Sequence, residues 1–114
     1  MTQRLLVMNG QRLLQSERGG EWITSKVDRA GFIKPGIYNL AQAASADKMK
    51  DYDGPVLHAD REHVFQQVGK TLIKHEVRNF SKVPETGSNT AIRYDGDHAL
   101  ITNSVVLPSR GIRR

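Results

Sequence analysis

Three of the four histidines lie in one stretch, DGPVLHADREHVFQQVGKTLIKHEV, which covers residues 53–77. His58 and His63 flank a predicted turn and His75 follows on the next apolar run, so the chemistry to consider is metal coordination. Zinc sites use two histidines one helical turn apart, or cysteine pairs, with a further ligand in place, and this stretch has neither pattern. The neighbouring acids fall in expected turns or on a hydrated face: Asp60, Glu62 and Glu76. We therefore predict surface histidines, no bound metal and no cofactor.

The sequence marks no catalytic nucleophile, general acid or general base. None of the serines lies in a Gly-x-Ser-x-Gly elbow, and there is no cysteine. The aspartate pairs at 51 and 53 and at 95 and 97 fall at predicted turns that contain a glycine, where aspartate commonly serves the backbone of the turn. The glycines match neither a phosphate loop nor a dinucleotide fingerprint. We predict a protein that is not an enzyme, has no catalytic residues and takes no small-molecule substrate.

Aromatic and basic side chains are the next group that is able to bind a partner. Aromatic rings interleaved with cations are what single-stranded nucleic-acid binders use for base stacking and phosphate contact. The residues that fit this role are Lys48, Lys50, Lys74, Tyr94, Arg110, Arg113 and Arg114. Ordinary barrels and protein interfaces show the same pattern. Direct nucleic-acid binding is therefore the alternative function, with Phe65 or Tyr94 stacking on bases.

The segment HVFQQVGK suggests a different kind of partner. Adjacent glutamines on a strand of mixed charge suit an exposed sheet edge that pairs with a strand of another protein. The contact surface predicted from this pattern is Phe65, Gln66, Gln67, Lys74 and His75.

The elements that must position these residues are predicted to be β-strands. In the first quarter of the chain, Asn9-Gly10 and Gly19-Gly20 accept positive φ at low cost. They predict turns between strands near residues 4–8, 11–16 and 21–27.

Pro35-Gly36 predicts a further turn, followed by a strand that begins in GIYNLAQAA. Residues 43–53 lose apolar periodicity, which predicts a loop or a single helical turn capped by Ser45 or Asp47.

From residue 55 the β signal is stronger, in the runs PVLHA, HVFQQV, TLIKHEV and TAIRY. A hairpin whose loop is Gly69-Lys70 would place His75 opposite Val64. Asp95-Gly96 predicts another turn, and residues 104–107 a possible final strand. The predicted fold is mainly β: a small antiparallel barrel, SH3-like or OB-like, with an N-terminal β extension and at most one short helix.

The composition is that of one small domain. The chain has 114 residues, 17 basic against 12 acidic side chains and a formal charge of +5, a balance that attracts polyanions. Its longest early apolar run, residues 5–8, is too short for a signal-peptide core or a membrane span. We expect a cytoplasmic protein with no membrane partner.

Residues 53–96 resemble the KfrB domain found in proteins of conjugative plasmids and related mobile elements. The matching features are the strands GPVLHAD and HVFQQVGK, the segment KHEVRNF, and VPETGSNTAIRY, which looks like the family's Val-Pro-x-x-Gly turn and next strand. The upstream IKPGIYNLAQAASADK is similar to the segment that often precedes the domain. The resemblance implies an accessory protein of partition or maintenance complexes that associates with other proteins. Members of the family also occur as modules appended to mobilisation proteins, so the resemblance implies a role in DNA processing as a further expectation.

We therefore expect a single β-rich domain over residues 1–107, with 53–107 as its KfrB-like part and 1–52 as an extension packed on it. Residues 108–114 are expected to form a basic disordered tail. The expected function is that of a non-enzymatic adaptor in maintenance, partition or transfer complexes, which binds another plasmid-encoded protein. Inhibition of a host or competing-plasmid enzyme is a third function, which no residue selects.

Overall fold

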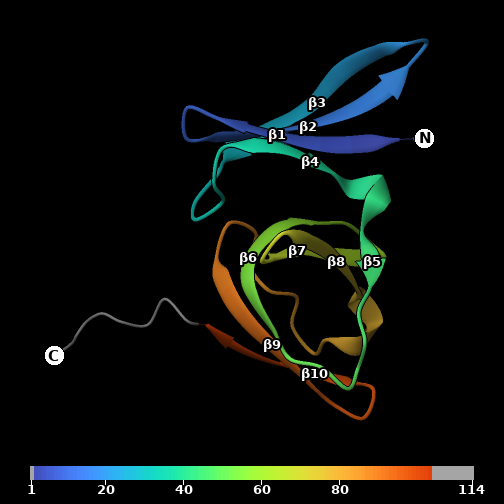
Figure 1. The fold of residues 1–114 in the computed structure, drawn as a ribbon, viewed down its shortest axis with the longest axis vertical. Helices are drawn as coiled ribbons and strands as arrows, with labels where there is room; N and C mark the ends of the chain where they lie inside the picture. Colours follow the sequence, from blue (N-terminus) through green and yellow to red (C-terminus); the bar gives the residue numbers. More distant parts are fainter. Residues whose placement is uncertain (1, 104–114) are drawn as a thin grey trace, which may run out of the picture.

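The computed structural model describes residues 2–103, which form two β-sheets stacked one above the other (Figure 1). Ten strands and two turns of 3₁₀ helix follow in this order: β1 (Gln3–Met8), β2 (Gln11–Arg18), β3 (Glu21–Arg29), β4 (Gly36–Asn39), η1 (Leu40–Gln42), β5 (Ala44–Ser45), β6 (Tyr52–Ala59), β7 (His63–Val68), β8 (Thr71–Glu76), η2 (Val77–Asn79), β9 (Asn89–Asp95) and β10 (His98–Asn103). The mainly β prediction is confirmed, and the described residues contain no α-helix. The two 3₁₀ turns exceed the one short helix that we allowed for.

The N-terminal strands form a four-stranded sheet in the order β3-β2-β1-β4, with every neighbouring pair antiparallel. Its first two hairpins turn at Asn9-Gly10 and Gly19-Gly20, where all four residues have positive φ. Turns of this kind match the right-handed twist of the strands that they join. The three predicted N-terminal strands are confirmed, each within two residues of its expected ends.

The other six strands form a sheet in the order β10-β9-β6-β7-β8-β5, which curls strongly upon itself. Val68 pairs with Thr71, which confirms the predicted hairpin with Gly69-Lys70 as its loop. The ladder is open from β10 to β5, and one isolated parallel bridge joins Phe80 to Ala99 of β10. The closed SH3-like or OB-like barrel therefore stays a prediction.

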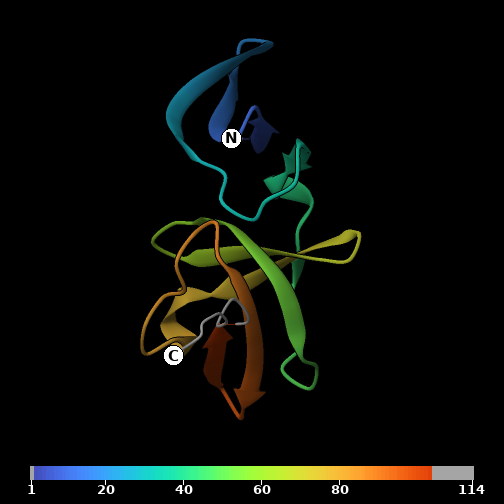
Figure 2. The same ribbon diagram turned by 90° about the vertical axis from the view of Figure 1, so that its left-hand side faces the viewer.

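A shared hydrophobic core joins the two sheets, and the N-terminal sheet lies across the curled one in both views (Figure 1, Figure 2). Its buried residues are Leu5, Val7, Ala30, Ile33, Tyr38 and Leu40 from the N-terminal part, with Leu57 of β6 and Phe65 of β7. Inside the curl lie the fully buried side chains of Val56, Val64 and Ile92. Strand β7 is thus covered on both faces and lies between β6 and β8, so the prediction that it is an exposed edge is wrong.

Two local predictions are displaced along the chain. Of the loop or helical turn expected within residues 43–53, the structure has the loop, between β5 and β6; a helical turn comes earlier, at Leu40–Gln42, where the Asn39 side chain caps it. Ser45, one of the expected caps, lies in β5, and the Asp47 carboxylate accepts a hydrogen bond from a backbone N–H two residues later.

The last hairpin turns at Gly96-Asp97, one residue later than expected, because Asp95 pairs with His98. The expected strand at 104–107 and the basic tail at 108–114 lie outside the described residues. No helix within residues 2–103 has the length and apolar character that crossing a bilayer requires.

The close approach of β6 to β7 gives a first test. A Cβ atom at Gly54 would overlap with the backbone carbonyl oxygen of Gln67, whereas a Cβ at Gly69 would meet open space. We expect Gly54→Ala to lower the free energy of unfolding by about 3 kcal/mol or more, because backbone must move. Gly69→Ala should cost only about 1–2 kcal/mol, for its positive φ. Urea denaturation of both variants measures the difference, and equal losses would contradict the packing described.

Candidate functional site

A hydrogen-bonded chain of three polar side chains crosses the interior of the curled sheet. Gln66 of β7 and His75 of β8 are fully buried, and the Gln66 Oε1 atom lies 2.9 Å from His75 Nε2. His75 Nδ1 lies 2.7 Å from the hydroxyl of Tyr94 on β9. The chain therefore links three strands and ends at a side chain that is half-buried at the surface.

The direction of these hydrogen bonds follows from the amide of Gln66. Its Nε2 group donates to the backbone carbonyls of Gly54, at 3.1 Å, and Thr90, at 2.8 Å. Its Oε1 atom must therefore accept from Nε2–H of a neutral His75, which leaves Nδ1 to accept from the hydroxyl of Tyr94. Burial agrees with this arrangement, since it lowers the pKa of His75 to about 4 and raises the pKa of Tyr94 to about 12.

The histidines do not converge on a common centre. Both ring nitrogens of His75 are already hydrogen-bonded inside the sheet. His58 is buried against Phe65, with ring centroids 6.0 Å apart, and burial lowers the pKa of His58 although Asp60 opposes this. Residues 2–103 hold no group of three or more histidine, aspartate or glutamate side chains able to bind a metal ion. The prediction of surface histidines is wrong for His58 and His75, whose rings pack in the interior.

Tyr94 opens onto a polar pocket of about 280 Å³. The pocket is lined by Ser45, Ala46, Lys48, His63, Lys74, Glu76, Asn79 and Tyr94. Three of the residues predicted to bind nucleic acid, Lys48, Lys74 and Tyr94, thus come together. The charge of Lys48 is compensated by Asp97 at 2.6 Å, and Glu76 adds a carboxylate to the wall. The hydroxyl of Tyr94 donates to His75, so the pocket combines two lysines with a carboxylate and an occupied hydroxyl.

The rest of that predicted set does not join the pocket. Lys50 is exposed but is not part of its lining. Arg110, Arg113 and Arg114 lie outside the described residues.

The predicted protein-contact surface is not an exposed face. Phe65 is 7% exposed, and Gln66 and His75 are fully buried, so for these three the prediction is wrong. The side chains of a strand alternate between its two faces, and here one face of β7 meets the N-terminal sheet while the other lines the interior. Only Gln67 and Lys74 keep part of their surface accessible.

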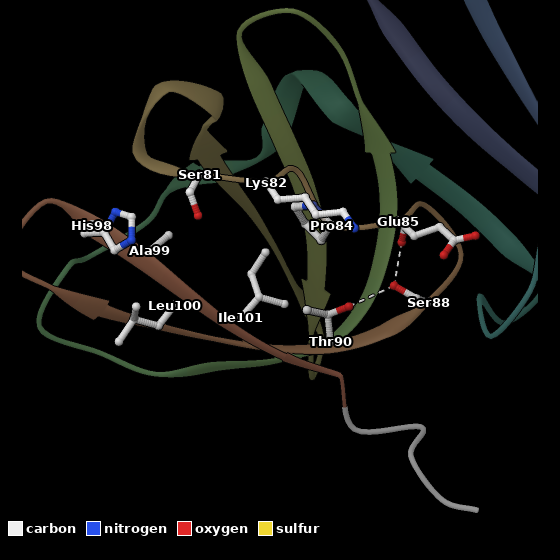
Figure 3. Close-up of a pocket in the computed structure, with 10 residues that line it drawn as sticks. All are labelled: Ser81, Lys82, Pro84, Glu85, Ser88, Thr90, His98, Ala99, Leu100 and Ile101. Carbon is white, nitrogen blue, oxygen red and sulfur yellow. Dashed lines mark hydrogen bonds between the residues drawn. The ribbon is translucent and has the colours of Figure 1, made fainter.

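A groove of about 420 Å³ lies along β10, and Thr90 of β9 is among its lining residues (Figure 3). Its walls are β10 and the segment 81–88, and its lining is Ser81, Lys82, Pro84, Glu85, Ser88, Thr90, His98, Ala99, Leu100 and Ile101. Ile101 points from β10 toward segment 81–88, whereas Leu100 comes from the other face of the strand.

The groove exposes a side chain that belongs to the interior face. Ile101 is paired with Ile92, which is 1% exposed, and shares a face with Ala99, yet Ile101 itself is 37% exposed. Beyond the Phe80–Ala99 bridge, segment 81–88 diverges from β10, and no strand among residues 2–103 pairs with this edge. The curled sheet therefore has an open seam, defined here as the groove between β10 and residues 81–88.

The backbone of β10 is also available at the seam. Asp95 and His98 close a two-residue hairpin loop, a position at which the paired residues are hydrogen-bonded to each other. Alternate residues, Ala99 and Ile101, therefore direct their N–H and C=O groups away from β9. Ala99 uses this direction for the bridge to Phe80, and within residues 2–103 no strand pairs with β10 on this side at Ile101.

Sequence reasoning missed both the buried chain and the seam. The pairing of His75 with Val64 was foreseen, and it already places His75 on the same face as Gln66. For the seam, the hairpin around Gly96 places Ile101 opposite Ile92. No local pattern, however, shows that segment 81–88 diverges from β10.

Two similarities to known proteins bear on this part of the molecule. The family model described as KfrB Domain matches residues 51–103, which run from the start of β6 to the end of β10. A protein of Escherichia coli named Protein TraB is 32% identical over 105 residues, which are 90% of this chain and 72% of that protein. The second similarity therefore extends over the N-terminal sheet as well.

The buried imidazole predicts how stability depends on pH. The pKa of His75 is about 4 in the folded chain and near 6.5 when unfolded, so between these values the unfolded state binds the extra proton. Stability should be unaffected by His75 above pH 6.5 and should fall as pH drops toward 4, by up to ~3 kcal/mol. Urea denaturation at a series of pH values measures this loss. A His75→Gln variant should show a weaker dependence in that window, and an unchanged dependence would contradict the assignment.

Proposed function

This chain belongs to the KfrB-domain family of conjugative plasmids and related mobile elements, and from that membership we propose that it is a non-enzymatic adaptor. It works in the cytoplasm within transfer, partition or maintenance complexes and binds another plasmid-encoded protein. The observation that carries the proposal is the open seam, where Ile101 is exposed although it lies on the interior face of the curled sheet. In this proposal the curled sheet is a barrel that its partner completes; it is antiparallel except for the parallel β5–β8 pair.

The partner contributes an extended segment that pairs with β10. Addition of a strand to an open sheet edge gains affinity from backbone hydrogen bonds and specificity from pockets for alternate side chains. At the seam, the backbone of Ile101 supplies the hydrogen bonds, and Pro84, Ala99 and Ile101 supply an apolar floor. The Phe80–Ala99 bridge supports a parallel orientation for the added strand, since it already holds one residue in that way.

The chemistry of the rim favours a segment with polar groups around one apolar side chain. Lys82, Glu85 and His98 surround the apolar floor, and the hydroxyls of Ser88 and Thr90 lie at one end. A partner residue with a branched apolar side chain would cover Ile101, while its neighbours along the strand meet the charged rim. Removal of such a side chain from water contributes roughly 25 cal/mol per Å² buried.

The test uses one position in the seam and one outside it. A photo-crosslinking amino acid placed at Ile101 should capture a plasmid-encoded protein in cells that carry the conjugative plasmid. Placed at Ile37 of β4, which is 62% exposed and does not line the seam, it should not capture that protein. Mass spectrometry of the crosslinked product identifies the captured protein.

A backbone variant separates pairing from side-chain contact. Ile101→Pro removes an N–H that points away from β9, and proline is tolerated at such edge positions. We expect Ile101→Pro to abolish binding of the captured protein, while its thermal unfolding midpoint stays close to that of the parent. Ile101→Ala should weaken binding less. Equal crosslinking at both positions, or full binding by Ile101→Pro, would refute the seam as the contact surface.

A further inference from the structure

A second open cleft lies between the N-terminal sheet and the segment that precedes β9. It has a volume of about 680 Å³ and is formed by β2, β3 and the loop that follows β3 on one side, and by residues 85–88 on the other. Its charged and aromatic lining residues are Arg12, Lys26, Asp28, Arg29, Phe32 and Glu85. None of the cations was among those selected from the sequence.

Phe32 is an exposed ring on a fixed backbone. Its side chain is 57% exposed, although an apolar residue of this size is usually buried. Its backbone N–H donates to the carbonyl of Gly87 at 2.8 Å, and a Cβ atom at the preceding Gly31 would lie only 2.5 Å from the same oxygen. The backbone of the loop is therefore held tightly against Gly87. This contact fixes the backbone that carries the Phe32 ring, and the ring itself stays exposed at the surface.

The floor of the cleft is a buried guanidinium. The side chain of Arg12 is 9% exposed, its Nη2 donates to Asp28 at 3.0 Å and its Nε donates to the carbonyl of Arg29 at 3.1 Å. Its Nη1 group has no hydrogen-bond partner among residues 2–103. This donor is held in place at the bottom of an open cleft, where an acceptor from a ligand can reach it.

Above the floor the cations outnumber the acids. Lys26 and Arg29 are exposed and form no ion pair within the described part of the chain, whereas Asp28 is taken by Arg12. Phe32 also lines a neighbouring hollow of about 410 Å³ together with Lys34. Exposed cations thus line the hollows on both sides of the ring. Two acids are also present: Asp53 lines the hollow of Lys34, and Glu85 lines the other wall of the cleft.

We infer that this cleft binds single-stranded nucleic acid, with Phe32 stacking on a base and with Arg12, Lys26 and Arg29 contacting phosphates. An exposed ring between cations is the arrangement with which sequence-tolerant binders hold single strands. A duplex keeps its bases stacked on one another, so it cannot use the ring in this way. This function is additional to the adaptor role; its cleft shares Glu85 and Ser88 with the seam, and its other lining residues are different.

The test is fluorescence anisotropy of the full-length protein with a labelled oligothymidylate and with a duplex, each at two salt concentrations. We expect preference for the single strand and affinity that falls steeply with salt. Phe32→Ala should weaken binding about tenfold or more, because loss of one base stack has that effect. The double variant Lys26→Ala, Arg29→Ala should reduce the slope of log affinity against log salt concentration by the amount expected for the loss of about two phosphate contacts. Glu85→Gln should strengthen binding, since it removes a carboxylate that repels phosphate.

Matched controls lie away from the cleft. Ile37→Ala removes an apolar side chain that is 62% exposed on β4, and Lys70→Ala removes an exposed cation in the β7–β8 turn. Both should bind like the parent protein. The inference is overturned by absence of binding at low salt, by equal affinity for single strand and duplex, or by a Phe32→Ala variant that binds normally. Loss of binding in Lys74→Ala with retention in Phe32→Ala would likewise overturn it, because the polar pocket would then be the site.

Discussion

The side-chain amide of Gln66 ties the curled sheet together. It lies on β7, donates to backbone carbonyls of β6 and β9, and accepts from His75 on β8, so one fully buried group joins four strands. A buried amide without these partners would cost about 1–3 kcal/mol for each unmet hydrogen bond, so the strands and the amide must assemble together. The curl that follows from this assembly creates both the interior and the open seam at its edge.

Close approach of backbones is the second constraint. Gly54 faces the carbonyl of Gln67, and Gly31 faces that of Gly87, so a side chain at either glycine would force strands or loops apart. The first contact brings β6 against β7 inside the curl. The second fixes the loop that carries Phe32 and thereby sets the distance between the N-terminal sheet and residues 85–88 at the cleft.

Segment 81–88 lies between the two surfaces that we assign to binding. Glu85 and Ser88 line both the seam and the cleft. The segment is held by a few backbone hydrogen bonds, among them Gly87 N–H to the carbonyl of Val56 at 2.8 Å, and not by a strand ladder. One irregular segment forms a wall of each site. A ligand bound at either site therefore contacts the same segment and affects where its residues lie.

Much of this architecture was present in the sequence. Paired turn residues such as Asn9-Gly10 and Gly69-Lys70 favour positive φ or a two-residue loop locally, and they fix hairpins and register without help from distant residues. The family followed from local strand and turn motifs in the same way. The candidate sites did not, because they depend on what covers each strand. Phe65 was expected outside and lies in the core, since only packing of the N-terminal sheet decides which faces of β7 are buried. Ile101 and Phe32 were unremarkable in sequence, and they became candidates only when the tertiary structure left an interior side chain and a clamped ring exposed.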